Sequence, residues 1–421
     1  MVELPTPTER GEGTPRRGTT GEVFLAFLRL GLTSFGGPTA HLGFFRSEFV
    51  ERRGWVTDRE YANLVALCQV LPGPASSQVG FALGLRRAGA LGGLAAFIAF
   101  TLPSAVALLA FAYGATTLEG PLWRGALAGL GVAAVAIVAH AVLGMARSLT
   151  PDLRRAGIAC TAAAAALLFP GVVGQLLAIA LGATGGALTC RAIARQEAAG
   201  RVGERAWASR SPRIPRRSFV CLATLGTLLV AAPLLARTTG AGWLALVDAN
   251  LRAGSLVFGG GHVVLPLLHA ELVTPGWVTE TDFAAGYAAA QAVPGPLFTF
   301  AGYLGALSGV GPGGAAGAAL ALVAIFTPGL LLVAAIAPVW SRLSAAPGAA
   351  AVLLGINAAV VGILAAALYR PIITSAITGL WPLLLALACF ALLQWPRVPA
   401  WAVVAVGAGA GVVGAAAGAF G

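Results

Sequence analysis

The sequence predicts an all-α polytopic membrane protein with two inverted-topology repeats, each having two re-entrant broken-helix hairpins followed by about four transmembrane helices. Three observations support this: the composition, an internal repeat and an uneven distribution of arginine. Of the 421 residues, 58% are hydrophobic and only 10% are charged, whereas soluble domains carry about 25% charged residues. Stretches such as 88–114 and 313–340 lack charge, and about 20 apolar residues suffice for a helix to cross a bilayer.

The internal repeat relates the beginnings of the two halves. Phe-Gly-Gly at 35–37 recurs at 258–260, and "QVLPGP" at 69–74 recurs as "QAVPGP" at 291–296. Between these motifs, "GWVT" also occurs in both copies. Such self-similarity indicates that the chain contains two related structural units.

Arginine is unevenly shared between the halves. All 27 basic residues are arginine, and 22 of them precede residue 218. Loop 46–60 contains four arginines, while its counterpart at 269–283 contains none. By the positive-inside rule, the first-half loops are cytoplasmic and the matching second-half loops are external. The repeats are therefore expected to be inverted, as in many secondary transporters.

These patterns divide the chain into five parts. Residues 1–21 are polar and form an expected disordered cytoplasmic tail, and 22–195 form the first transport repeat. An Arg-rich cytoplasmic linker follows at 196–217. A linking transmembrane helix at 218–236 provides the odd crossing that inversion requires, and 237–421 form the second, inverted repeat.

Each repeat is expected to begin with two re-entrant hairpins, at 22–45 and 62–85 and at 243–268 and 284–307. Proline interrupts a helix, and broken backbone at membrane depth is tolerated only within protein or beside a watery cavity. An alternative counts 243–268 and its partner as full spans. The remaining full crossings are expected at 88–114, 122–146, 156–170, 171–190, 313–340, 347–369, 372–394 and 398–420, which makes about nine with the linking helix.

The breaks are candidate anion sites because helix N-termini carry unpaired N–H groups and partial positive charge. Arginines six residues before each Gly-Gly pair would add charge at membrane depth, where ionisable groups are usually functional. The candidate substrate-binding residues are Arg29, Gly36, Gly37, Gln69, Pro72, Gly73, Pro74, Ser76, Ser77, Arg252, Gly259, Gly260, Gln291, Pro294, Gly295, Pro296 and Thr299.

Other interpretations of these residues stay open. The Pro-Gly-Pro segments could be plain kinks, and the Gly-Gly pairs could serve packing alone. The two arginines could instead pair with Glu48 or Glu271. His140 is expected to be a hydrogen-bonded core residue, and Asn357 a polar contact between helices. Neither a catalytic constellation nor a metal-ligand spacing is evident, so we expect no enzyme, cofactor, metal or nucleic-acid partner.

The quoted motifs resemble those of the chromate ion transporter family. The resemblance rests on "FLRLGLTSFGGPTAHLGFF", "GWVTDREY" and "QVLPGP" in the first half and on their second-half copies. It implies a long-chain, two-domain chromate efflux transporter of the bacterial inner membrane. The N-terminus would be cytoplasmic, in keeping with the arginine pattern.

The resemblance also implies the cargo. Chromate, a sulfate-like dianion, would be exported, and the proton-motive force is a possible driver. The opposed broken hairpins place the expected anion site near the midplane between the repeats. A transporter or channel for sulfate or another small anion is the alternative. Membrane lipid is an expected partner, and a homodimer is kept as an open expectation.

Overall fold

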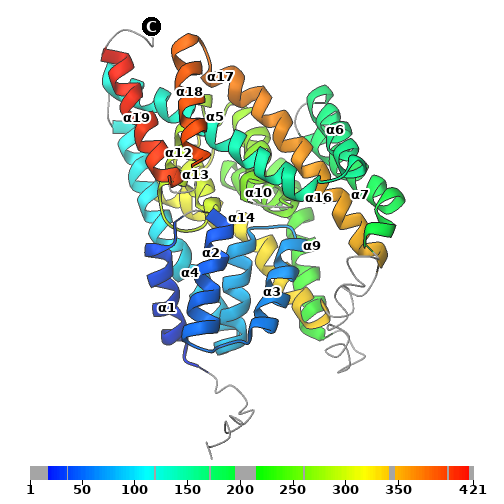
Figure 1. Ribbon diagram of the computed structural model, residues 1–421. Coiled ribbons are helices and arrows are strands. Elements are labelled where there is room, and N and C mark those ends of the chain that lie inside the picture. Colours follow the sequence, from blue (N-terminus) through cyan, green and yellow to red (C-terminus); the bar gives the residue numbers. More distant parts are fainter. Residues whose placement is uncertain are drawn as a thin grey trace, which may run out of the picture.

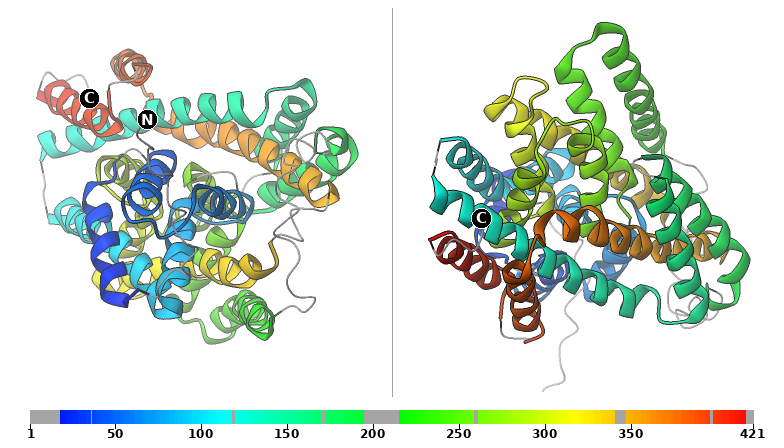
Figure 2. Two further views of the ribbon diagram at one scale, coloured as in Figure 1. Left: turned by 60° about the horizontal axis from the view of Figure 1, so that its bottom comes forward. Right: turned by 90° about the horizontal axis from the view of Figure 1, so that it is seen from above.

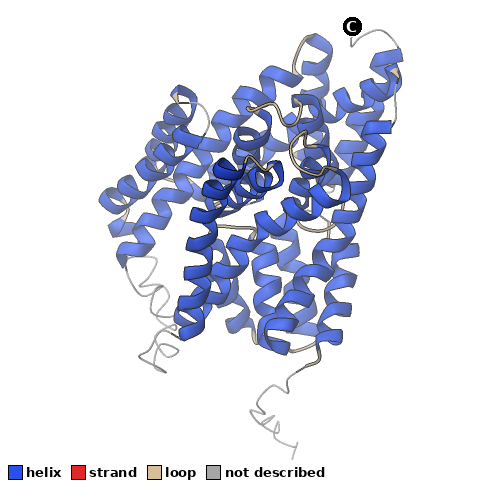
Figure 3. Ribbon diagram, turned by 180° about the vertical axis from the view of Figure 1, so that it is seen from behind, coloured by secondary structure: helices blue, strands red, loops and turns tan. Residues whose placement is uncertain are grey.

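The computed structural model describes residues 18–35, 37–117, 120–169, 172–194, 215–258, 261–340, 347–395 and 398–416. Throughout these ranges the regular structure is helical, and they contain no strand (Figure 3). Five helices are long and apolar enough to cross a membrane. The predicted all-α, multi-pass membrane protein is therefore confirmed at this level.

The first repeat begins with short helices separated by breaks. They are α1 (Thr20–Thr33), α2 (Gly37–Arg46), the π-helix η1 (Ser47–Arg52), α3 (Asp58–Val70) and α4 (Ala75–Thr117). The Thr19 hydroxyl caps α1, which therefore begins inside the predicted 1–21 tail. Helix α3 has a capping box, in which Thr57 and Glu60 satisfy each other's free backbone N–H groups. Residues 1–17 of the predicted tail lie outside the described residues.

Longer helices complete this repeat. They are α5 (Pro121–Leu149), α6 (Leu153–Leu168) and α7 (Val172–Thr189), and the linking helix α9 (Arg216–Thr239) follows. The predicted linking segment, 218–236, lies within α9. Most of the predicted Arg-rich linker, 196–214, falls outside the described residues, and its last two arginines belong to the first turn of α9.

The second repeat follows the same order. Its elements are α10 (Gly242–Leu256), η3 (Gly261–Val263), α11 (Val264–Leu268), η4 (His269–Val273), α12 (Glu280–Ala292), η5 (Leu297–Thr299), α13 (Phe300–Leu307), α14 (Gly314–Ile336), η6 (Ala337–Val339), α16 (Pro347–Ala367), η7 (Leu368–Ile373), α17 (Thr374–Ala376), α18 (Leu380–Leu393) and α19 (Ala400–Ala416).

The five long apolar helices coincide with the predicted crossings at 88–114, 122–146, 218–236, 313–340 and 347–369. The other four predicted crossings correspond to α6, α7, α18 and α19, which have 16, 18, 14 and 17 residues. These helices are shorter than the roughly 20 residues that span a hydrocarbon core. Helix length alone therefore supports five full crossings among the described residues, and the expected nine stay a prediction.

The chain doubles back within each predicted hairpin. The Trp55 indole donates a hydrogen bond to Glu22 at 3.2 Å, which places the end of η1 beside the start of α1. Arg86, in the first part of α4, pairs with Glu60 at the start of α3. In the second repeat, the Gly309 amide donates to the Trp277 carbonyl at 2.9 Å. Re-entry of these hairpins from opposite membrane faces stays a prediction.

The C-terminal parts of the two repeats are exchanged. Helix α5 packs against α18 and α19 of the second repeat, while α16 packs against α6 and α7 of the first. The long helices α5 and α16 also touch each other and run along one side of the hairpin bundle (Figures 1 and 2). The C-terminal helices of each repeat therefore pack against the long helix of the other repeat.

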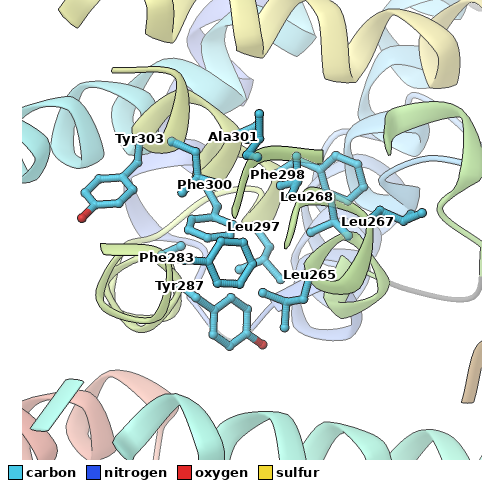
Figure 4. Packing of buried hydrophobic residues seen from close by; sticks show 14 of the residues in the cluster. Leu265, Leu267, Leu268, Phe283, Tyr287, Leu297, Phe298, Phe300, Ala301 and Tyr303 are labelled. Carbon is cyan, nitrogen blue, oxygen red and sulfur yellow. The ribbon is translucent and has the colours of Figure 1, made fainter. Parts of the chain in front are cut away.

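Aromatic side chains fill the core of each hairpin pair. In the first repeat, Phe27 stacks on Phe49 with ring centroids 4.7 Å apart. In the second, Phe300 meets Phe283 and Tyr287 edge-on at 5.1 and 6.0 Å (Figure 4). Edge-to-face and offset packing are the favoured arrangements of such rings. These cores hold the helix breaks in place.

Candidate functional site

The two Pro-Gly-Pro segments form tight breaks between helices. Gly73 and Gly295 have φ values of +124° and +109°, a region that favours glycine. A Cβ at Gly73 would lie 3.0 Å from the Gly329 Cα, and one at Gly295 would lie 2.7 Å from the Ser104 hydroxyl. Backbone conformation and close packing therefore both require glycine here.

Each Pro-Gly-Pro break is bonded to the other repeat. The Gly73 amide donates to the Val257 carbonyl at 2.7 Å, and the Gly295 amide donates to the Ser34 carbonyl at 3.1 Å. Ser34 and Val257 are the equivalent residues just after α1 and α10. Because proline has no N–H, glycine supplies the only backbone donor of each Pro-Gly-Pro segment. Each Pro-Gly-Pro break therefore contacts the break that follows the first helix, α1 or α10, of the other repeat.

A cavity of about 570 Å³ lies beside these breaks. It is bounded by the first-repeat helices α2 and α3, the start of α4 and the second half of α5, with η3 and α16 from the second repeat. Its lining residues are Pro38, Leu42, Cys68, Gln69, Leu71, Gly73, Ala75, His140, Ala141, Gly144, Met145, Ser148, Leu149, His262 and Asn357. Among the described residues, no Asp or Glu lines it.

The cavity's lining favours hydrogen-bond donors. His140, His262, Asn357 and Gln69 supply polar side chains from four separate elements. Helices α2 and α4 begin at the cavity, with Pro38 and Ala75 in their first turns. Helix N-termini present free N–H groups and partial positive charge. This arrangement suits a small anion that accepts hydrogen bonds.

The predicted site residues are only partly gathered here. Gln69 and Gly73 line the cavity, and Gly37 opens α2 beside it. Gln291 lies within 3.5 Å of the His262 ring, next to the cavity. Gly36, Gly259 and Gly260 lie outside the described residues.

Other predicted residues support the breaks instead. Ser76, Ser77 and Thr299 are at most 2% exposed, and the Thr299 hydroxyl donates to the Pro296 carbonyl. The buried Ser77 hydroxyl has no hydrogen-bond partner among the described residues. The residues Pro72, Pro74, Pro294, Gly295 and Pro296 shape the two breaks without lining this cavity.

The two predicted arginines differ from each other. Arg252 pairs with Glu271 at 2.6 Å and with Asp248 at 3.1 Å. The Arg29 side chain is exposed, and none of the ion pairs among the described residues involves it. Neither arginine lines the cavity. The structure therefore does not bring them to the breaks, although sequence spacing placed them equally near.

Sequence reasoning missed three polar lining residues. His140 and Asn357 were expected to be core contacts, and His262 was noted only as a difference between the copies. The signal that could have marked His140 and Asn357 is an isolated polar side chain within an apolar segment. Their convergence depends on α5 and α16 crossing beside η3, which no local pattern encodes.

Charged residues instead cluster at the hairpin ends. Arg52 and Arg53 both contact Glu48, at 2.9 and 2.6 Å. At the neighbouring Glu60, burial alone would raise the pKa, but the Thr57 amide and the Arg86 guanidinium hold the pKa of that carboxyl below its usual 4.5. These pairs fix the hairpin ends and leave the cavity without a fixed charge.

No group of three or more His, Cys, Asp and Glu side chains within the described ranges could hold a metal ion. The five cysteines are free, three of them buried. The polar chemistry of the cavity therefore rests on imidazole, amide and backbone groups.

Comparison with known proteins identifies the family. The family model described as "Chromate transporter" matches residues 21–187 and again 244–413, so it covers both repeats. The chain is 29% identical over 328 residues to a chromate transport protein of Pseudomonas aeruginosa, covering 75% of this chain and 72% of that protein. It is 30% identical over 344 residues to a probable chromate transport protein of Synechococcus elongatus, covering 81% of each.

A chromate transport protein of Cupriavidus metallidurans is also similar, at 28% identity over 350 residues, with 82% of this chain and 80% of that protein covered. No solved structure matches. The two family matches coincide with the two repeats whose breaks meet at the cavity, and together they cover most of the chain. This protein therefore belongs to the chromate transporter family.

Proposed function

We propose that this protein is a secondary transporter that exports chromate, a sulfate-like dianion, across the bacterial inner membrane. The anion would bind in the cavity of about 570 Å³ beside the paired breaks. The observation that carries this proposal is the convergence of two helix N-termini and four polar side chains on a cavity without a lining carboxylate among the described residues.

A second cavity supports alternating access. It measures about 530 Å³ and is lined in part by Pro266, His269, Ala366 and Arg370. Its lining comes from α6, α7, α11, η4, α16 and η7, so it lies in a different part of the molecule from the first cavity. An inverted-repeat transporter needs a route for cargo to each membrane face, and we propose this cavity as part of the second route. The cytoplasmic N-terminus and opposite-face hairpins are part of this proposal.

The energetics are consistent with reversible binding. A cavity without a fixed cation binds a dianion through hydrogen bonds and helix ends, each contributing modestly. Transport requires binding that is tight enough to load cargo and weak enough to release it. We propose the proton-motive force as the driver, because its negative-inside membrane potential favours outward movement of a dianion.

The test is uptake of radiolabelled chromate by everted membrane vesicles that contain the protein. We expect accumulation that an uncoupler abolishes and that excess sulfate reduces, relative to vesicles without the protein. Accumulation no greater than electrochemical equilibrium with the membrane potential would favour a passive channel. Stronger competition by sulfate than by unlabelled chromate would favour the sulfate alternative, and no protein-dependent uptake would overturn the export proposal.

The same assay tests the proposed role of the arginines. R29A should abolish uptake without loss of membrane insertion if Arg29 supplies charge to the anion in transit. R252A leaves buried Glu271 without its partner, so the double variant R252A/E271Q is the appropriate comparison. Normal transport by R29A and by the double variant would remove both arginines from the mechanism.

A further inference from the structure

Two histidines from different repeats face the same cavity. His140 comes from the second half of α5, and His262 comes from η3, just after the second Phe-Gly-Gly segment. We propose that His140 and His262 select the transported anion: each offers an imidazole N–H to an oxygen of a fully deprotonated tetrahedral dianion. This inference rests on the proposed function, because it assumes that the cavity binds the cargo.

The Gln394 side chain determines the tautomer of His140. The His140 Nδ1 lies 3.3 Å from the Gln394 amide nitrogen, at the end of α18. An amide NH₂ can only donate, so Nδ1 accepts and the ring proton resides on Nε2. No partner for Nε2 occurs among the described residues, and this N–H is therefore available to an anion in the cavity.

His262 is held in the same tautomer by α12. Its Nδ1 lies 2.6 Å from the Tyr287 hydroxyl and 3.5 Å from the Gln291 amide nitrogen. The amide again only donates, and a phenol O–H can donate to the same lone-pair side of the ring. Nδ1 therefore accepts, and Nε2–H is free to donate. The predicted site residue Gln291 thus acts by positioning His262.

The remaining lining sharpens the selectivity. Asn357 and Gln69 are amides that can turn an NH₂ group toward an anion, and no lining carboxylate occurs among the described residues. Hydrogen phosphate carries a P–OH group that needs an acceptor, whereas chromate and sulfate dianions only accept. An amide that turns its oxygen toward the P–OH group gives up its own donation to the anion, so hydrogen phosphate loses hydrogen bonds in this cavity. The cavity should therefore discriminate against hydrogen phosphate.

The imidazole pair belongs to the first cavity. Among the described residues, the second cavity is lined by one histidine, His269, and by Arg370. The two cavities differ chemically: the first selects by neutral donors and the second attracts by charge.

The experiment is isothermal titration calorimetry on the full-length protein in detergent. Sulfate, chromate and phosphate are each titrated in mildly alkaline buffer, where phosphate keeps one proton. We expect wild-type protein to bind sulfate and chromate at least about tenfold more tightly than hydrogen phosphate. H140A and H262A should each weaken dianion binding about tenfold or more, with H140Q and H262Q partly restoring it because glutamine retains an N–H donor.

The control is C160A, which changes an exposed residue of α6 that lines neither cavity and should leave affinity unchanged. Melting temperatures identify variants that fail to fold. If an alanine variant fails to fold, the affinity of the matching glutamine variant tests the role of that histidine. Unchanged sulfate affinity in H140A and H262A, or equal wild-type affinity for hydrogen phosphate, would overturn this inference and leave the transport proposal standing. Absence of any oxyanion binding by wild-type protein would instead overturn the assignment of the cavity as the cargo site.

Discussion

Equivalent residues in the two repeats have acquired different surroundings. Arg29 and Arg252 occupy matching positions, yet only Arg252 has Asp248 one turn before it, at 3.1 Å. The residue that matches Asp248 in the first repeat is Leu25, which is exposed. A charge without a nearby carboxylate stays at the surface because burial without a partner is costly. The two arginines occupy the same place in the repeated motif, but the change from Leu25 to Asp248 gives only Arg252 a carboxylate partner one turn away.

The pH dependence of stability should report on Glu60. The Thr57 amide and Arg86 keep its folded-state pKa below 4.5, despite the opposing effect of burial. A lowered carboxyl pKa stabilises the fold above the unfolded-state value, and this stabilisation is lost as pH falls through the folded-state pKa. We therefore expect wild-type thermal stability to fall below about pH 4.5, and E60Q to flatten that part of the profile.

Thermal unfolding in detergent across an acidic pH series measures this effect. E51Q is the matched control because Glu51 belongs to an exposed pair with Arg46, and exposed pairs contribute little. An E60Q profile that tracks wild type throughout the acidic range would contradict the role given to Glu60.

At the scale of elements, glycines set how closely helices from different repeats approach. A Cβ at Gly129 of α5 would lie 2.1 Å from the Gly407 carbonyl oxygen of α19, and one at Gly355 of α16 would lie 2.0 Å from the Gly182 carbonyl oxygen of α7. Small residues permit such contacts inside membranes. The α5–α19 and α16–α7 contacts occupy equivalent places in the two repeats. Close glycine contacts therefore support the exchanged packing of the C-terminal helices at both places.

Substitution at this crossing should be strongly destabilising. G129V places branched carbons where the α19 backbone lies, and overpacking of this kind costs about 1–3 kcal/mol or more. We expect a lower melting temperature and reduced yield of folded protein. G226V in α9 is the control, because a Cβ there meets nothing within 4 Å. Equal melting temperatures for the two variants would show that close packing of α5 on α19 is not needed.

Several elements were predictable from sequence because their signals are local. Pro-Gly-Pro marks where α3 ends at Val70 and where α12 ends at Ala292. Uncharged stretches predicted the long helices correctly. The short helices α6 and α18 were harder, since apolar runs do not reveal whether a helix crosses fully or packs obliquely within a hairpin. The cavity was not predictable, because His140 and His262 meet only through contacts between distant elements.

At the scale of the whole molecule, two repeats interlock through both their breaks and their long helices. The Gly73–Val257 and Gly295–Ser34 hydrogen bonds pair each break with the other repeat, and α5 and α16 each pack against the other repeat's C-terminal helices. The first-repeat loop holds the arginines Arg46, Arg52 and Arg53, while its counterpart around Thr274 has none. This contrast carries the prediction that the repeats are inserted in opposite orientations.

Cysteine labelling tests that orientation. Ser47 and Thr274 are exposed in the matching loops, and S47C and T274C are introduced separately into a variant without native cysteines. A membrane-impermeant maleimide should modify S47C in everted vesicles and T274C in right-side-out vesicles. Labelling of both positions from one side would refute inverted insertion.

The paired hydrogen bonds between breaks also bear on how the protein is made. The first repeat is synthesised before the second, so the Gly73 amide must await the Val257 carbonyl, whereas the Ser34 carbonyl already has the His41 ring 3.1 Å away in its own repeat. Each unpaired backbone group costs several kcal/mol in hydrocarbon. If the breaks lie at membrane depth as predicted, a nascent chain stalled before residue 257 keeps the Gly73 amide without its partner until the second repeat arrives.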